Sequence, residues 1–145
     1  MDELNASMKI ALANTFVMYF QSHSYHWNVE GPNFTQYHEF LNGLYEDLHG
    51  AVDPIAEHIR ALDAYAPISI ADVLSAATIA QDTAKPATPI QMFSNLLSSN
   101  TEVVAALQKA ADHANSINNQ GLLNFLADRL DVHAKHAWML KSLLK

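Results

Sequence analysis

Residues 33–62 have the sequence NFTQYHEFLNGLYEDLHGAVDPIAEHIRAL, and this stretch decides the fold. Large apolar residues recur in it at every third or fourth position, which is typical of the buried face of a long α-helix. Asn33 is a good N-cap residue, and Gln36 stands where a capping box needs it. We therefore expect one helix over about 33–62. Its apolar positions are Phe34, Tyr37, Leu41, Leu44, Leu48, Val52, Ile55 and Ile59.

The same spacing continues upstream of this stretch. It predicts a helix over about 3–29, which Gly31 and Pro32 bring to an end. After residue 62 the pattern becomes looser and prolines interrupt it. Within this looser segment, Ser69 is placed to cap a short helix over about 70–77.

A strong helix start follows at Thr88, with proline at the first helical position and Gln91 three residues after the cap. It predicts a helix over about 89–114, and the apolar spacing predicts a last one over about 118–144. Two helices, a crossover with a short helix, and two more helices make an all-α, ferritin-like four-helix bundle.

The composition limits the function. A length of 145 residues favours a single domain over 1–145, and the absence of cysteine excludes disulfides, thiolate ligands and thiol catalysis. The net charge of −7 argues against nucleic acid as a partner, because phosphate binding depends on clustered Lys and Arg. Eight histidines point to metal or proton chemistry. The low share of charged residues, 16%, favours a surface partly covered by other subunits.

The N-terminal apolar stretch 10–20 is interrupted by Asn14 and Thr15 and is too short to span a bilayer. It also lacks the features of a signal peptide. We therefore expect no membrane association and a cytoplasmic location.

A ferritin-like bundle commonly holds two irons inside one chain, with Glu-x-x-His on two helices and a lone Glu on each of the others. This sequence has one such motif, Glu46-x-x-His49, and no glutamate after Glu102. The expected last helix has only Asp128 and Asp131 as acids. The intra-bundle site is therefore expected to be incomplete, and a solvated face is the simpler interpretation of the motif.

His26, His38, Asp53 and Glu57 form a better set, because imidazole with carboxylates suits iron or zinc. The turn after the first helix could bring the two histidines together. His38 and Asp53, however, lie ~22 Å apart along one helix at 1.5 Å per residue. If the four share one site, two chains must contribute to it, and a two-fold dimer is the smallest such assembly. Ordinary packing and a polar helix face remain alternatives.

The sequence resembles the Dps family, the mini-ferritins named as DNA-binding proteins from starved cells. The similarity covers nearly the whole chain and rests on five segments. They are HWNVEGPNF at 26–34, YHE at 37–39, LYEDL at 44–48, DxxAExIR at 53–60 and DRLDxHxKHAWML at 128–140.

The resemblance implies a hollow dodecamer of 23 symmetry with ferroxidase centres between two subunits. It implies that His26 and His38 of one chain and Asp53 and Glu57 of another are the metal ligands. The implied reaction is the oxidation of Fe(II), by hydrogen peroxide in preference to oxygen. Ferric mineral would be stored in the cavity, which protects against oxidative stress.

The resemblance also suggests roles for three pairs of residues. Glu39 and Glu46 would face the cavity and seed mineral. Asp128 and Asp131 would line an acidic pore. Trp27 and Trp138 would lie near the centre and intercept stray radicals. Solvated helix faces and packing remain alternatives for all three.

The sequence departs from the family in three places. Its first eight residues contain no base, so we expect no DNA binding. Pro54 lies between two proposed ligands, where it should kink the helix. Asp63 stands where the family commonly has glycine. These departures leave a non-catalytic zinc- or iron-sequestering shell as the alternative function, and disfavour a purely structural DNA-protecting role.

Overall fold

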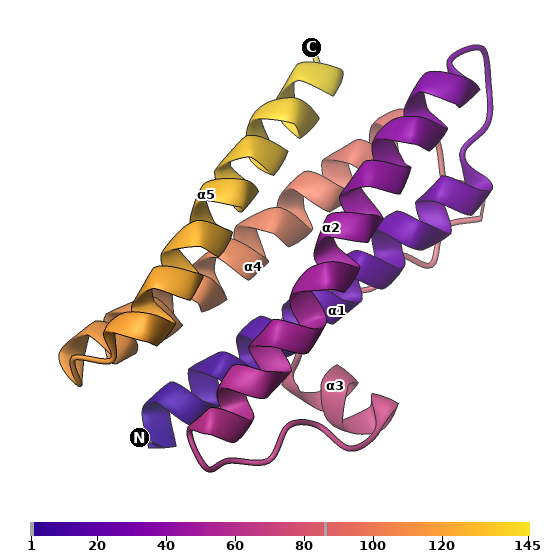
Figure 1. Cartoon of the computed structure of the whole chain (residues 1–145). Helices are drawn as coiled ribbons and strands as arrows, with labels where there is room; N and C mark the ends of the chain where they lie inside the picture. Colours follow the sequence, from indigo (N-terminus) through magenta and orange to yellow (C-terminus); the bar gives the residue numbers. More distant parts are fainter. Residues whose placement is uncertain (1, 86) are drawn as a thin grey trace.

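The computed structural model describes residues 2–85 and 87–145, and every regular element in these ranges is an α-helix. The elements are α1 (Asp2–Asn28), α2 (Phe34–Ala61), α3 (Ile70–Ala76), α4 (Pro89–Ser116) and α5 (Gln120–Leu143). Figure 1 shows the four long helices side by side, with α3 on the long connection between α2 and α4. This connection returns the chain along the bundle, so that α2 and α4 run in the same direction. The architecture is the one that the helical spacing predicts.

The apolar spacing of α2 marks its buried face, as predicted. Leu41, Leu48, Ile55 and Ile59 are completely buried in a core to which all four long helices contribute. The helix continues through Pro54, although proline has no N–H to donate to the carbonyl one turn earlier.

All three predicted helix starts are confirmed in position, but the side-chain capping bond forms at only two of them. Thr88 and Gln91 form the expected capping box, and the Ser69 hydroxyl accepts from the N–H of Asp72. Asn33 precedes α2 but makes no side-chain capping bond. Its φ of −103° and ψ of 22° are not the extended N-cap geometry, and its amide instead lies 3.4 Å from the Tyr37 hydroxyl.

Left-handed residues end two helices. At the end of α2, Asp63 has a φ of 62°, and the N–H of Ala64 donates to the carbonyl of Ile59. Asn118 has a φ of 57° and is the left-handed residue that follows the end of α4. The last helix therefore starts at Gln120, two residues later than predicted. Glycine takes this conformation at less cost than aspartate, so Asp63, in place of the family's glycine, puts strain on the backbone at the end of α2.

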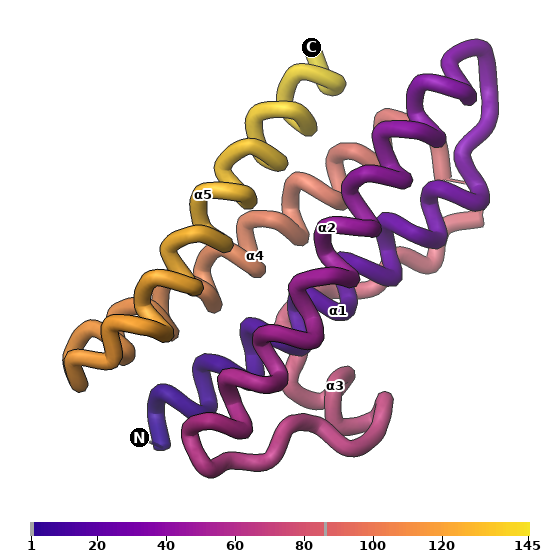
Figure 2. The backbone as a smooth tube through the Cα atoms, in the orientation of Figure 1, coloured from indigo at the N-terminus to yellow at the C-terminus, as the bar shows by residue number. Residues whose placement is uncertain are grey.

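The helices do not pack equally. The α1 backbone packs closely on α2 and α4, and α5 packs closely on α4, whereas α5 approaches α2 much less closely. Figure 2 shows the wide separation between the α2 and α5 backbones. Longer side chains must therefore connect these two helices. In the described part of the chain, no helix is both long enough and apolar enough to cross a membrane.

Candidate functional site

The turn between α1 and α2 brings His26 and His38 together, as the sequence predicted. The two imidazole rings stack with centroids 3.7 Å apart and planes 16° apart. Nδ1 of His26 donates to the backbone carbonyl of His38, and Nδ1 of His38 donates to the carbonyl of His26, both at 2.8 Å. These reciprocal bonds fix both rings to the backbone of the opposite helix.

The reciprocal bonds also fix the tautomer of each ring. A carbonyl oxygen can only accept, so Nδ1 of each histidine carries a proton. In a neutral ring, the lone pair then lies on Nε2. This is the usual arrangement of a metal-binding histidine, whose other nitrogen donates to a carbonyl or carboxylate. The pair thus provides two oriented nitrogen donors.

Asp53 and Glu57 lie one helical turn apart on α2, and both are exposed. They lie far along α2 from His38, at ~1.5 Å per residue. In the described residues of one chain, no three or more His, Asp or Glu side chains come close enough to hold a metal ion. A single chain therefore offers a two-histidine half and a two-carboxylate half, well separated.

The other residues singled out in the sequence lie at the surface. Glu39 and Glu46 are exposed on α2, and Asp128 and Asp131 are exposed on α5. Both tryptophans are also largely exposed, with 57% of Trp27 and 64% of Trp138 accessible. Trp27 lies near the two-histidine half, because its ring centroid is 4.3 Å from that of His23, the residue one turn before His26.

No sequence pattern singled out the rings of His23 and Tyr45 beside this half. His23 stacks on Tyr45 with centroids 3.8 Å apart and planes 5° apart. Nδ1 of His23 also lies 2.9 Å from the Tyr19 hydroxyl. Burial, and then the neighbouring His26 and His49, lower the pKa of His23. The sequence could have indicated the contact of Tyr19 with His23, because residues four apart share a helix face. It could not have indicated the stacking of His23 on Tyr45, which lies on another helix.

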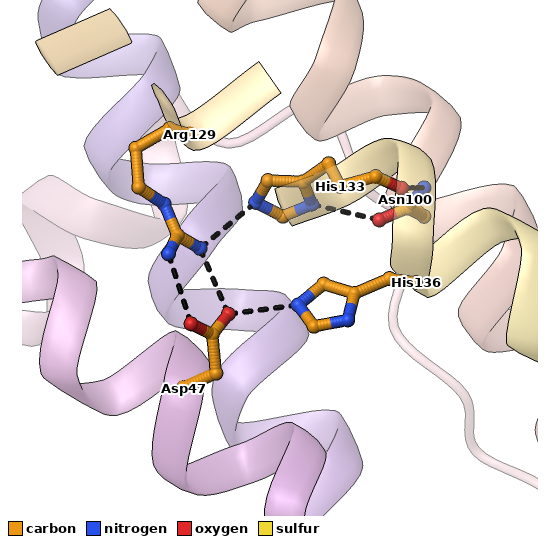
Figure 3. A network of polar contacts seen from close by, with 5 residues as sticks. All are labelled: Asp47, Asn100, Arg129, His133 and His136. Carbon is orange, nitrogen blue, oxygen red and sulfur yellow. Dashed lines mark hydrogen bonds and ion pairs between the residues drawn. The ribbon is translucent and has the colours of Figure 1, made fainter. Parts of the chain in front are cut away.

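A second polar cluster bridges α2 and α5 (Figure 3). Arg129 donates to both carboxylate oxygens of Asp47, at 3.0 Å each, and Nε2 of His136 lies 2.7 Å from Asp47 Oδ2. Arg129 also donates to Nε2 of His133, at 3.1 Å. Nδ1 of His133 therefore carries the proton and donates to Asn100 Oδ1, at 2.7 Å. We call these five residues the Asp47 cluster.

The surroundings of Asp47 and His133 in this cluster fix the protonation state of each. Burial alone would raise the pKa of Asp47, but the hydrogen bonds from His136 and Arg129 hold it well below its usual range. Burial, with the Arg129 charge beside it, lowers the pKa of His133 to about 3. His133 is thus neutral at neutral pH, and Asp47 neutralises the buried guanidinium. Glu46 and His49, the lone Glu-x-x-His motif, are both exposed and outside this cluster.

Comparison with known proteins agrees with this architecture. A family model for the ferritin-like domain matches residues 5–145. The chain is 30% identical over 135 residues to a DNA protection during starvation protein of Brevibacillus brevis, and the alignment covers 92% of this chain and 89% of that one. The Dps structure from Thermosynechococcus elongatus has a TM-score of 0.94 at 25% identity, covering 99% of this chain and 91% of that one.

A Dps structure from Vibrio cholerae O1, described as a member of a broad superfamily of ferritin-like diiron-carboxylate proteins, has a TM-score of 0.93 at 26% identity. It covers 99% of this chain and 90% of that one. The fold and the helix order thus define a ferritin-like four-helix-bundle protein. Within that class, the chain belongs to the Dps family of mini-ferritins.

Proposed function

We propose that this protein oxidises Fe(II) at sites shared by two subunits and stores the ferric product inside a hollow shell. The observation that carries the proposal is the locked His26–His38 pair, whose Nε2 atoms are available as ligands. Membership of the Dps family, and the diiron-carboxylate description of the Vibrio cholerae relative, support iron as the metal.

Two chains are needed to complete each site. A two-fold axis would set His26 and His38 of one chain against Asp53 and Glu57 of the other, and would form the same site twice. Exposed apolar side chains on the α1 and α3 side support a covered surface there. Among them, 52% of Phe20, 89% of Ile68 and 61% of Ile70 are accessible in the single chain. The family resemblance extends the dimer to a dodecamer.

The mixed nitrogen and oxygen ligands suit the proposed reaction, in which iron is the substrate. Imidazole nitrogens and carboxylate oxygens bind Fe(II) and leave positions open for an oxidant. Each of two Fe(II) ions gives one electron, and hydrogen peroxide takes both and is reduced to water. Peroxide is thereby removed without release of hydroxyl radical. Oxygen is the second candidate oxidant, and protection of the cytoplasm against oxidative stress is the proposed outcome.

The exposed acids support the supply and storage of iron. We assign Asp128 and Asp131 on α5 to an acidic entry route, and Glu39 and Glu46 on α2 to mineral nucleation. The net charge of −7 favours attraction of cations at long range. It also opposes contact with DNA phosphates, so DNA binding is not part of the proposal.

The test measures ferric absorbance after Fe(II) and peroxide are added anaerobically to the assembled protein. Wild type should consume about two Fe(II) per peroxide, as the transfer of one electron from each metal requires. His38→Ala combined with Asp53→Ala should abolish the fast phase, because both halves of every site are damaged. His113→Ala combined with Asp112→Ala is the matched control on α4, and it should retain the wild-type rate. An unchanged rate in the first variant would refute the site.

Pro54 favours one alternative, a shell that sequesters zinc or iron without turnover. It lies between Asp53 and Glu57, where the lost backbone hydrogen bond can alter how the two carboxylates are presented. Calorimetric titration with zinc, run beside the oxidation assay, separates the two functions. Tight zinc binding with no iron oxidation would favour sequestration.

A further inference from the structure

Two further histidines lie beside the two-histidine half and take no part in the proposed iron site. His23 on α1 is partly buried, and His49 on α2 is exposed. Both rings pack on Tyr19, with centroids 5.6 Å and 4.9 Å from that of the phenol. The surface between α1 and α2 therefore carries two more imidazoles, which we call the His23–His49 pair.

The ring nitrogens of this pair are available to a metal ion. The Tyr19 hydroxyl oxygen lies 2.9 Å from Nδ1 of His23, and when that nitrogen donates to it the lone pair of the ring lies on Nε2. Tyr19 then does for His23 what backbone carbonyls do for His26 and His38. In the part of the chain that the structure describes, His49 makes no hydrogen bond to protein.

The His23–His49 pair lies on the face that carries both proposed halves of the iron site. At about 3.6 residues per turn, His49 is within ~40° of both His38 and Asp53 around α2. On α1, Phe20 and Trp27 lie one turn to either side of His23, and 52% and 57% of their surfaces are exposed. Exposed apolar side chains around the pair favour a face that a second chain covers.

The proposed two-fold axis crosses α2 close to this pair. The axis sets His38 of one chain against Asp53 and Glu57 of the other, so that the two α2 helices run antiparallel. It must therefore pass midway between these positions, which is near residues 45–48. This midpoint lies ~11–14 Å along α2 from His38, at ~1.5 Å per residue.

Both histidines of the pair lie near that midpoint. His49 is ~2–5 Å from it along α2. His23 stacks on Tyr45, beside the midpoint, with ring centroids 3.8 Å apart. The axis therefore gathers four imidazoles, two from each chain, in the space between the two proposed iron sites.

We propose that His23 and His49 of one chain, together with His23 and His49 of the partner subunit, bind one zinc or copper(II) ion on the two-fold axis. Four imidazole nitrogens can provide the tetrahedral set that zinc prefers, and they also suit copper(II). The affinity of nitrogen ligands rises from Fe(II) to Cu(II), so this site favours copper or zinc over iron. The ion would link the two chains. The site rests on the proposed function, because it uses the same pairing of chains.

The test titrates the assembled, metal-free protein with copper(II) alone and follows bound metal and the EPR spectrum. His38→Ala combined with Asp53→Ala damages both halves of every proposed iron site and leaves the His23–His49 pair intact. This variant should still bind about one copper(II) per two chains, with hyperfine splitting from four nitrogens. Absence of this binding, or a spectrum without the four-nitrogen splitting, would overturn the proposal.

His49→Gln, added to the same variant, tests the ligands themselves. His49 is exposed, so the chain should still fold and assemble. The change removes two of the four nitrogens and should weaken copper binding by more than ~100-fold, because loss of a ligand's hydrogen-bond partner alone costs ~10–100-fold. His113→Gln on α4 is the matched control and should bind copper as before. Equal binding in the His49 and His113 variants would refute the site.

Iron oxidation by wild type, measured on the same preparation, separates this site from the proposed function. If no iron is oxidised but the four-nitrogen copper signal appears, the proposed function fails and the axis site stands. If iron is oxidised and the signal is absent, the axis site alone is refuted. A copper signal in wild type that requires Asp53 as well as His49 would assign His49 to the carboxylate half, and would also overturn the axis site.

Discussion

The two-histidine half and the Asp47 cluster both use α2, but they differ in how complete they are within one chain. The Asp47 cluster satisfies its charges internally, because Arg129, His136 and Asp47 meet across the wide gap between α2 and α5. The two-histidine half is held by two backbone bonds and leaves its Nε2 atoms free. The Asp47 cluster thus pairs its charges within one chain, whereas the two-histidine half leaves two ring nitrogens without a partner in that chain.

The largest expected effect in stability is at the closed cluster. Asp47→Ala leaves the buried Arg129 guanidinium without its counter-charge, which should cost about 3 kcal/mol of unfolding free energy. We take the lower end of the usual range because 31% of the Asp47 side chain is exposed. Denaturant unfolding measures the change. Glu46→Ala, at the exposed neighbouring position, is the control and should alter stability by less than ~0.5 kcal/mol. Equal losses in the two variants would remove the distinction between the regions.

The cluster also predicts a dependence of stability on acid. The pKa of His133 is lowered from 6.5 to about 3 in the folded chain, so the unfolded chain binds more protons between these values. Stability is therefore full above pH 6.5 and falls as the pH drops toward 3, by at most ~1.4 kcal/mol per pH unit. Asp47, with its lowered pKa, adds a loss in the same direction at still lower pH. His133→Gln should flatten the slope above about pH 4, as measured by denaturant unfolding at a series of pH values. An unchanged slope would mean that His133 titrates normally in the fold.

A smaller effect is expected where α2 ends. Asp63 has a φ of 62°, so Asp63→Gly should stabilise the fold by about 0.5 kcal/mol, and Asp63→Ala should destabilise it. Neither change should alter the Asp47 cluster or the rate of iron oxidation, because Asp63 belongs to neither and lies beyond the end of α2. Thermal unfolding of the metal-free protein should give melting temperatures that fall in the order Asp63→Gly, wild type, Asp63→Ala. Any other order would contradict the left-handed backbone at this residue.

Much of the fold could be predicted from local patterns, because they act within a helix or a turn. The spacing of apolar residues located all four long helices, and Thr88 with Gln91 marked the start of α4. Asn33 marked the start of α2 correctly, but its capping bond did not form, because that bond needs extended backbone geometry that the sequence does not reveal. Pairing of His26 with His38 was predictable because only a short turn separates their helices.

The Asp47 cluster could not be predicted in this way. Asp47 and Arg129 are separated by 82 positions, and their contact depends on how far α2 stands from α5. The stacking of His23 on Tyr45 has the same origin, because the two rings come from different helices. Such contacts follow from packing and not from spacing within one helix. The proposed shared site is still harder to predict from the sequence, because its carboxylate half belongs to another chain.

Mixing two inactive variants tests that shared site most directly. His38→Ala damages only the histidine half, and Asp53→Ala damages only the carboxylate half. A two-fold pair with one chain of each kind has one doubly damaged site and one intact site. Chains unfolded together in equal amounts and reassembled should therefore recover about a quarter of wild-type iron oxidation, although each variant alone is inactive. No recovery, in shells shown by mass to contain both chains, would contradict a site shared between subunits.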